Sequence, residues 1–124
     1  MLQQSNISDL IFIDIETTPA YENLQKVPEY EQLLWEEKRG RYRLETESME
    51  DFYFNNAGIY AEFGKIICIS VGLVTKNNNA LEYNKISFYG DDESVILKDF
   101  YLFLDKSFKQ NSKINFCGHN IKEF

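Results

Sequence analysis

Residues 10–19, Leu-Ile-Phe-Ile-Asp-Ile-Glu-Thr-Thr-Pro, constrain the fold of this chain more than any other stretch. An apolar run rich in β-branched residues gives way to two carboxylates, two hydroxyls and a proline, which predicts a buried strand running out into a polar rim. Because side chains alternate along a strand, Asp14 and Glu16 share one face, while the isoleucines beside them cover the other. We therefore expect a strand that is buried on both faces and carries two carboxylates at its end.

The carboxylates of Asp14 and Glu16 are separated by one residue, so they repel each other and are costly to desolvate unless a cation compensates their charge. A hard divalent ion such as Mg²⁺ or Mn²⁺ is the natural partner of such oxygen ligands. The alternative is a strand that simply emerges into water, with both residues solvated at its rim. The Asp-x-Glu pattern alone does not decide between a metal site and a solvated rim.

Composition limits which partners the chain as a whole can attract. Thirteen Lys and Arg against twenty Asp and Glu give a formal net charge of -7, so any nucleic-acid phosphate must be held locally. The 124 residues, of which 44% are hydrophobic, suffice for one domain with a real core. No apolar stretch approaches the roughly 20 residues that span a bilayer, and residues 1–9 resemble neither a secretory signal nor a transit peptide. These features predict a soluble, cytoplasmic protein without a membrane partner.

The two cysteines, Cys68 and Cys117, stand in apolar, strand-like contexts far apart in the sequence. They lack the paired spacing of a zinc site, which favours buried free thiols. This interpretation agrees with a reducing compartment.

A segment from about residue 20 to residue 62 interrupts the strand pattern and predicts a helical insertion. One helix starts at Pro28 and ends by Gly40, and a second, shorter helix is capped by Ser48 and ends at Gly58. The basic residues near the end of the first helix are either a phosphate-facing patch or cations favoured by the helix dipole: Lys38, Arg39, Arg41 and Arg43. We favour the second interpretation.

The second half of the chain predicts two strands, a helix and a further strand. Residues 65–74 are a nearly continuous apolar run typical of a central strand, and residues 76–79 are a turn into a second strand at 80–89. The apolar positions of that second strand change phase midway, which predicts a bulge or break. A helix ending near Ser107 follows, and then a short strand at 114–117.

This order of elements predicts an α/β chain with a mixed sheet, in which an antiparallel hairpin is combined with parallel strands. In such sheets ligands bind at the carboxyl ends of the strands, where we expect Asp14 and Glu16 to lie. The strand ending at Cys117 should deliver a second polar cluster, residues 118–120, to the same edge.

Two ordered motifs resemble those of a known superfamily. Residues 12–19, Phe-Ile-Asp-Ile-Glu-Thr-Thr-Pro, resemble the first motif of the DEDD 3′–5′ exonucleases, and residues 118–124, Gly-His-Asn-Ile-Lys-Glu-Phe, resemble the start of their second motif. Residues 58–72 are similar to a bacterial group of stand-alone predicted exonucleases related to the proofreading domains of family B DNA polymerases. The resemblance implies a ribonuclease H-like fold.

The resemblance also implies two metal ions, Mg²⁺ or Mn²⁺, held by four acidic residues. Asp14 would match the carboxylate that bridges both ions, and Glu16 a ligand of the ion that activates water. The residues that would contact or position the terminal nucleotide are Thr17, Thr18, His119 and Asn120. The implied reaction is hydrolysis of the last phosphodiester of a single-stranded 3′ end. We favour DNA over RNA as the substrate, although no residue of the chain decides between them. Tyr60, Phe63 and Phe124 are candidates for base stacking, although core packing is favoured for each.

The chain departs from the family pattern after Phe124, where the second-motif aspartate and the third motif would follow. We therefore expect residues 1–124 to be the N-terminal portion of a single exonuclease domain, incomplete at its C-terminus. On their own they should bind metal weakly, show little or no nuclease activity, and self-associate through uncovered apolar surface. One alternative is a non-catalytic nucleic-acid-binding or regulatory module of the same fold, and another is an enzyme that trims RNA ends.

Overall fold

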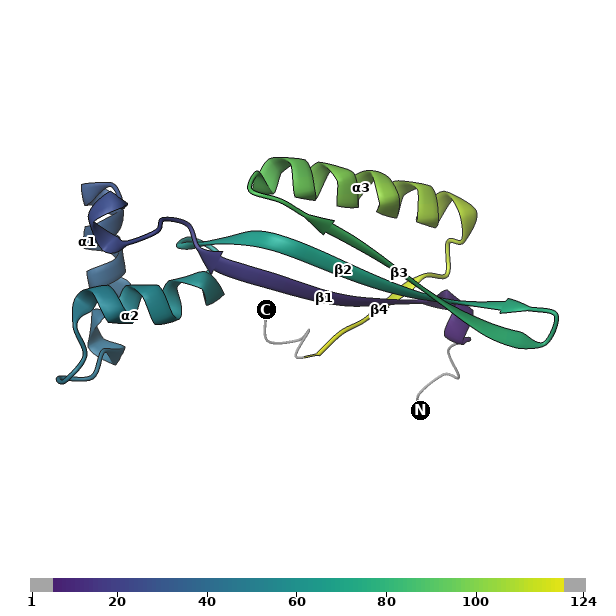
Figure 1. Ribbon diagram of the computed structural model, residues 1–124, viewed down its shortest axis with the longest axis horizontal. Coiled ribbons are helices and arrows are strands. Elements are labelled where there is room, and N and C mark those ends of the chain that lie inside the picture. The colour runs from purple at the N-terminus through teal and green to yellow at the C-terminus, as the bar shows by residue number, and fades with distance from the viewer. Residues whose placement is uncertain (1–5, 120–124) are drawn as a thin grey trace. The chain divides into compact units, whose positions relative to one another are not determined.

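The computed structural model describes residues 6–119 and shows a mixed four-stranded sheet accompanied by helices (Figure 1). The strands are β1 (Leu10–Pro19), β2 (Gly64–Asn77), β3 (Ala80–Tyr89) and β4 (Asn115–Cys117), arranged in the order β3-β2-β1-β4. Strands β1 and β4 are parallel, and the other neighbouring pairs are antiparallel. The predicted α/β class, with a hairpin and parallel strands in one mixed sheet, is confirmed.

The chain divides into two compact units, and both boundaries fall inside strands. One unit contains the residues up to Glu16 together with those from Ile67 onward, and is called the sheet unit. The other contains Thr17–Ile66 and is called the helical unit. Strands β1 and β2 therefore each contribute residues to both units.

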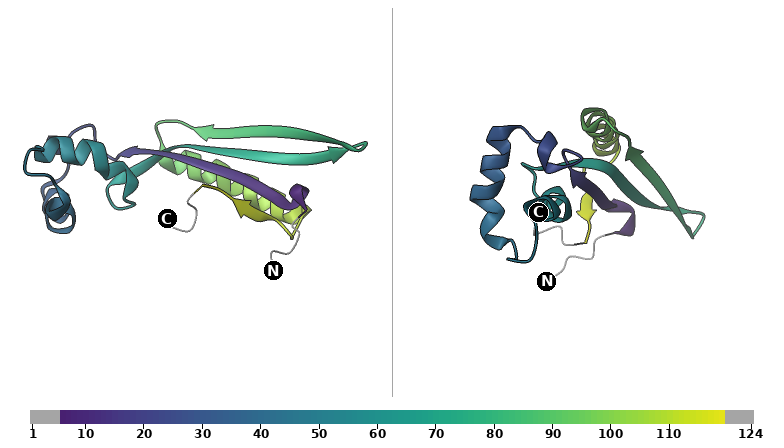
Figure 2. Two further views of the ribbon diagram at one scale, coloured as in Figure 1. Left: turned by 90° about the horizontal axis from the view of Figure 1, so that it is seen from below. Right: turned by 60° about the vertical axis from the view of Figure 1, so that its left-hand side comes forward.

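In the sheet unit, helix α3 (Glu93–Gln110) covers one face of the sheet (Figures 1 and 2). The ring centroid of Phe88 in β3 lies 5.8 Å from that of Phe100 and 5.7 Å from that of Phe103. Since antiparallel partners share a face, Ile69, the partner of Phe88, lies on this covered face, and it is 1% exposed. Val71 lies on the same face and is fully buried. This covered face is the core of the sheet unit.

Helix α3 is capped by Asp92 and ends three residues later than predicted. The Asp92 carboxylate accepts a hydrogen bond from the Ser94 N–H at 2.9 Å. At the other end the helix continues past Ser107 to Gln110, and the side-chain amide of the next residue, Asn111, donates to the Asp9 carboxylate at 2.8 Å. This contact with a residue from the start of the chain fixes the helix end, so local sequence could not reveal it.

The β2–β3 hairpin closes with two left-handed residues, Asn78 (φ 46°) and Asn79 (φ 67°), as the asparagine-rich turn predicts. Its pairing is continuous from Cys68 opposite Tyr89 to Asn77 opposite Ala80, so the predicted bulge in β3 is wrong. The apolar positions change phase because the two halves of β3 carry their apolar side chains on opposite faces of the sheet. Ile86 and Phe88 point to the covered face, whereas Leu81 and Tyr83 lie on the opposite face and are 61% and 65% exposed.

In the helical unit, α1 (Glu29–Arg39) carries Trp35, which is fully buried and packs against α2 (Met49–Asn56). Both predicted helices are confirmed, and Ser48 caps α2 by accepting a hydrogen bond from the Asp51 N–H at 3.0 Å. The indole contacts the rings of Phe52 and Phe63, with both centroids at 5.1 Å. Short 3₁₀ turns complete the structure: η1 (Ile7–Asp9), η2 (Leu24–Lys26), η3 (Gly40–Tyr42) and η4 (Ala57–Ile59).

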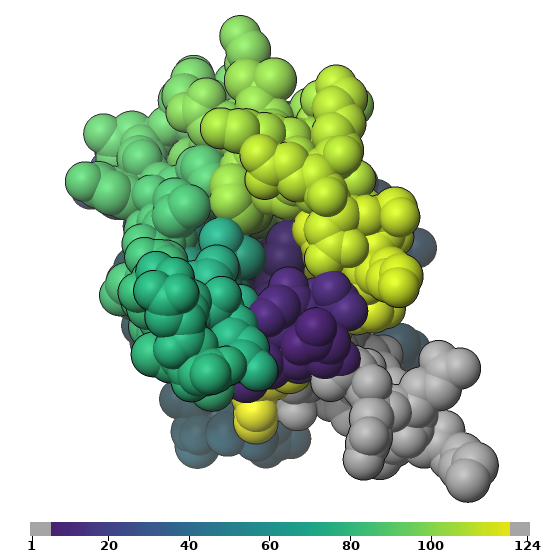
Figure 3. Space-filling view, turned by 90° about the vertical axis from the view of Figure 1, so that its right-hand side faces the viewer, coloured from purple at the N-terminus to yellow at the C-terminus, as the bar shows by residue number. Residues whose placement is uncertain are grey.

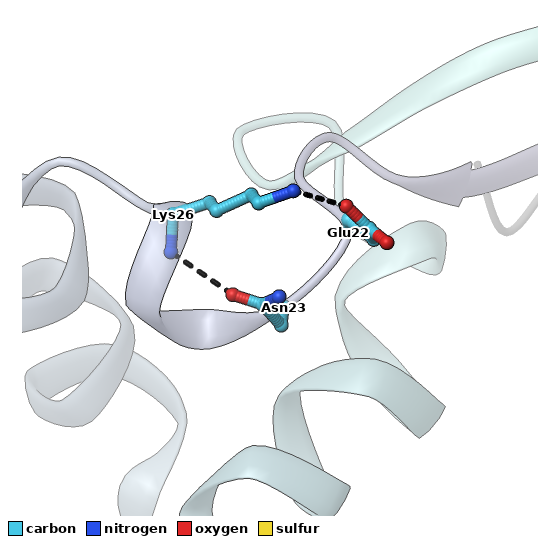
Figure 4. Close-up of polar contacts among 3 residues, drawn as sticks. All are labelled: Glu22, Asn23 and Lys26. Carbon is cyan, nitrogen blue, oxygen red and sulfur yellow. Dashed lines mark hydrogen bonds and ion pairs between the residues drawn. The ribbon is translucent and has the colours of Figure 1, made fainter.

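The η2 turn is held by local polar contacts, which Figure 4 shows. The Lys26 backbone N–H donates to Asn23 Oδ1 at 3.1 Å, and the Lys26 ammonium group pairs with the Glu22 carboxylate. Hydrogen bonding to Lys26 lowers the pKa of the Glu22 carboxyl. Within residues 6–119, none of the helices combines the length and apolar character that a membrane span requires.

Candidate functional site

The acidic pair lies inside β1, which continues to Pro19, and not at the end of the strand as predicted; it is also more exposed than the sequence predicts. Asp14 and Glu16 are exposed, and within β1 only Ile11 is buried, at 1% exposed. The prediction of a strand buried on both faces is therefore wrong. The reason is that α3 covers the face of Ile11, while Asp14 lies on the opposite face of the same strand. We call this opposite face the open face.

Strand β4 brings the second polar cluster beside β1. The parallel register pairs Ile11 with Phe116 and Phe12 with Cys117. Gly118 and His119, which follow β4, therefore lie directly after the end of this pairing. The start of β1 lies between the hairpin and the segment containing the end of α3 and β4 (Figure 3). The first motif and the described start of the second, Gly118 and His119, are thus brought close together by one short parallel pairing.

A hollow of about 690 Å³ occupies the open face at this position. Asp14, Gly118 and His119 all line it, and His119 is itself exposed. The structure therefore brings together one carboxylate of the first motif and the histidine of the second. A carboxylate, an imidazole and exposed backbone in one open hollow can bind a cation and a polar ligand together.

The remaining predicted site residues are not all brought to this hollow. Glu16 is exposed, but it is not among the described residues that line the hollow. Thr17 is exposed and Thr18 half-buried, and both belong to the helical unit. Asn120 lies outside the described residues.

The metal site stays a prediction, for which the structure provides only the donor chemistry of the acidic pair. Asp14 and Glu16 lie two residues apart on one side of a strand, so their Cα atoms are about 6.6 Å apart, and both carry the oxygen donors that Mg²⁺ prefers. In the described range 6–119, no three His, Cys, Asp or Glu side chains group closely enough to hold a metal ion. Within these residues, the two carboxylates therefore do not form a complete metal site by themselves.

The hollow also contains residues that the sequence did not single out, chiefly Tyr83 and Lys85 of β3 with Ser70 and Gly72 of β2. Lys85 pairs with Gly72, and the Ser70 hydroxyl is 3.0 Å from that of Ser87 in a cross-strand hydrogen bond. The sequence shows that these residues take alternate positions along their strands and so share one face of the hairpin. Whether that face is also the face of Asp14 depends on strand register, which the sequence does not reveal.

Both cysteines are on the open face, which corrects their predicted burial. Cys68 is half-buried and Cys117 is exposed, and both are free thiols. Cys117 lines the hollow beside Asp14. An apolar sequence context did not imply burial here because the face that carries these residues is the one opposite α3.

Comparisons of the chain with protein-family models, with curated proteins and with solved structures find no match. The function of this site must therefore be inferred from its own residues and from the resemblance of its two motifs.

The other candidate nucleotide contacts lie in the helical unit and have structural partners there. Lys38 pairs with Glu62 at 3.2 Å, and the Arg39 guanidinium stacks over the Tyr60 ring at 3.7 Å from its centroid. Phe63 is only 3% exposed and packs on Trp35, so its ring is not available for base stacking. These contacts favour the structural interpretation of the basic cluster. Phe124 lies outside the described residues.

Proposed function

We propose that this chain contributes the first pair of acidic ligands to a metal-dependent 3′–5′ exonuclease with a ribonuclease H-like fold, related to the DEDD superfamily. The observation that carries the proposal is the shared hollow of Asp14 and His119 beside the parallel pair β1 and β4. It supports the proposal because the two motifs that resemble the family would have to meet at one site. A chance likeness in two short motifs would not require them to lie together.

In this proposal Asp14 and Glu16 hold the divalent ions through their carboxylate oxygens. Two bound Mg²⁺ or Mn²⁺ ions would supply an activated water and stabilise the charge that develops on the last phosphodiester. Thr17 and Thr18 orient the terminal nucleotide, and His119 positions the substrate. Asn120 would share this positioning role on the strength of the motif alone.

The charge of the chain fits a substrate held at one point better than a bound duplex. With a formal net charge of -7, the chain attracts phosphate only where a local cation or metal ion offsets its carboxylates. The open hollow is accessible to the end of a single strand. We accordingly propose a single-stranded 3′ end as the substrate, with DNA favoured over RNA.

The test is a cleavage assay on 5′-labelled single-stranded DNA and RNA of the same sequence, with Mg²⁺ or EDTA. The resemblance assigns the remaining carboxylates to positions after Phe124, so the assay compares residues 1–124 with a chain that continues through those positions. We expect the longer chain to shorten the strand one nucleotide at a time, and Asp14→Asn to slow it by about a thousandfold. Asp99→Asn, on the exposed side of α3, should leave the rate unchanged.

Three results would contradict the proposal: cleavage that persists in EDTA, cleavage at internal bonds only, or an Asp14→Asn variant as fast as wild type. Strand binding by the longer chain without cleavage would instead favour the non-catalytic module.

A further inference from the structure

The hollow beside Asp14 extends across the sheet to Tyr83 and Lys85, which the proposed metal chemistry does not use. We infer that these two side chains form a nucleotide subsite, in which a base stacks on Tyr83 and a backbone phosphate pairs with Lys85. This inference rests on the proposed function, because it names how the same site would hold its single-stranded substrate.

The hydroxyl end of the Tyr83 ring lies close to the backbone of β2 at Gly72. A Cβ atom at Gly72 would lie 2.6 Å from Tyr83 Oη and 2.9 Å from Tyr83 Cε2, which is closer than real contacts allow. The missing side chain at Gly72 therefore leaves the space that the ring occupies. The ring is nevertheless 65% exposed, so one of its sides is available to a ligand. A supported, exposed aromatic ring is the platform on which bases of single strands stack.

Lys85 supplies the matching positive charge. It is two residues from Tyr83 on the same strand, so both side chains leave the same face with Cα atoms about 7 Å apart. Such a spacing suits a base on one residue and its backbone phosphate on the other. Lys85 also partly offsets the Asp14 carboxylate, which would otherwise repel a phosphate in the hollow.

The distance from Tyr83 and Lys85 to the acidic residues of β1 also suits a single bound strand end. Strand β3 is separated from β1 by β2 alone, so its backbone lies about 10 Å from that of β1 at two strand spacings. A nucleotide on Tyr83 and Lys85 can therefore belong to the same strand end as a phosphodiester beside Asp14. The combination of an exposed aromatic ring and a cation favours a nucleotide over an apolar peptide or a second copy of this chain.

The experiment uses residues 1–124 and a short oligothymidylate that carries the fluorescent base 2-aminopurine at its 3′ terminus, titrated with Mg²⁺ present. Stacking on Tyr83 should quench the fluorescence. We expect Tyr83→Leu to weaken binding by about 5- to 100-fold and to abolish the quenching, while Tyr83→Phe, which keeps the ring, retains both. Tyr101→Leu on α3 is the matched control, because Tyr101 is 67% exposed and lies outside the hollow.

Two further variants separate a subsite from a structural role. Gly72→Ala should displace the ring of Tyr83 and reduce quenching without removing the tyrosine. Lys85→Gln should reduce the slope of log affinity against log salt concentration by about 0.7, the value for one phosphate contact in a single strand. Lys106→Gln on α3 is its control and should leave the slope unchanged. Circular dichroism verifies that each variant is folded.

Equal quenching by wild type and Tyr83→Leu, or an unchanged salt slope in Lys85→Gln, would overturn the subsite. So would a wild-type chain that neither binds nor quenches the oligonucleotide, or one that instead self-associates through Tyr83. None of these results would decide the proposed exonuclease activity, which the cleavage assay with Asp14→Asn tests independently.

Discussion

Replacing Asp14 by Asn should have opposite effects on stability with and without Mg²⁺. Asp14 and Glu16 are exposed carboxylates on one side of β1 with Cα atoms about 6.6 Å apart. At that distance two unit charges in water repel each other by about 0.6 kcal/mol, and salt reduces this further. In EDTA, Asp14→Asn should therefore raise the free energy of unfolding by at most about 0.6 kcal/mol.

With Mg²⁺, the wild type should instead have the higher free energy of unfolding. Two carboxylates without the rest of a ligand set are expected to bind with a Kd of about 1 mM, as in weak oxygen-ligand sites. At 10 mM Mg²⁺, binding to the folded state alone stabilises it by about 1.4 kcal/mol. For a chain of this size that is a rise in Tm of about 5 °C, which Asp14→Asn and Glu16→Gln should each abolish.

Thermal unfolding followed by circular dichroism, in EDTA and in Mg²⁺, measures both effects. Asp99→Asn on α3 is the control and should keep the full Mg²⁺ shift. Trp35 is the one tryptophan of the sequence and lies in the helical unit, so its fluorescence follows that unit separately. Equal Mg²⁺ shifts in wild type and Asp14→Asn, or no shift in wild type, would refute the assignment of this pair as metal ligands.

Four further predictions concern the fold. Trp35→Ala should destabilise the helical unit by about 3–5 kcal/mol and remove helical circular dichroism, whereas Tyr30→Ala on the same helix, at 64% exposed, should cost less than about 0.5 kcal/mol. Ser48→Ala should cost about 1 kcal/mol in denaturant unfolding and Ser48→Asn, which keeps both an acceptor and a donor, close to nothing; equal losses in both would argue against the cap. Burial raises the pKa of the Tyr53 hydroxyl, so its stabilising contribution is complete below about pH 10 and is lost as pH rises through the raised folded-state pKa; unfolding titrations of Tyr53→Phe should lack this decline. Light scattering at high concentration should detect self-association, because large apolar side chains are exposed on both units, and a strictly monomeric chain would contradict this.

Local signals in the sequence determined the elements themselves. Pro28 and Gly40 bracket α1, Ser48 caps α2, and the asparagines at 78 and 79 close the hairpin with positive φ values. Each of these is a contact or a backbone preference within a few residues, so a pattern in the sequence is sufficient to reveal it. The α/β class and the mixed sheet follow from the order of those elements.

Tertiary structure decided which faces are buried. The prediction of a bulge in β3 and that of a doubly buried β1 share one error, since both treat apolar side chains as evidence of burial. Only the packing of α3 determines that Phe88 is covered while Tyr83, on the same continuous strand, is exposed. Contacts between elements that are distant in sequence determine which side chains are buried. The apolar periodicity of a single strand does not reveal this burial.

In the candidate site, too, the sequence determines one part and the tertiary structure another. The sequence identified Asp14 and His119 as carriers of chemistry from their residue types and motifs, but it could not place them together. The parallel pairing of Phe12 with Cys117 does so, and the hairpin register adds Tyr83 and Lys85 to the same hollow. Residue type fixes what a side chain can bind, whereas strand register fixes which side chains can bind the same ligand.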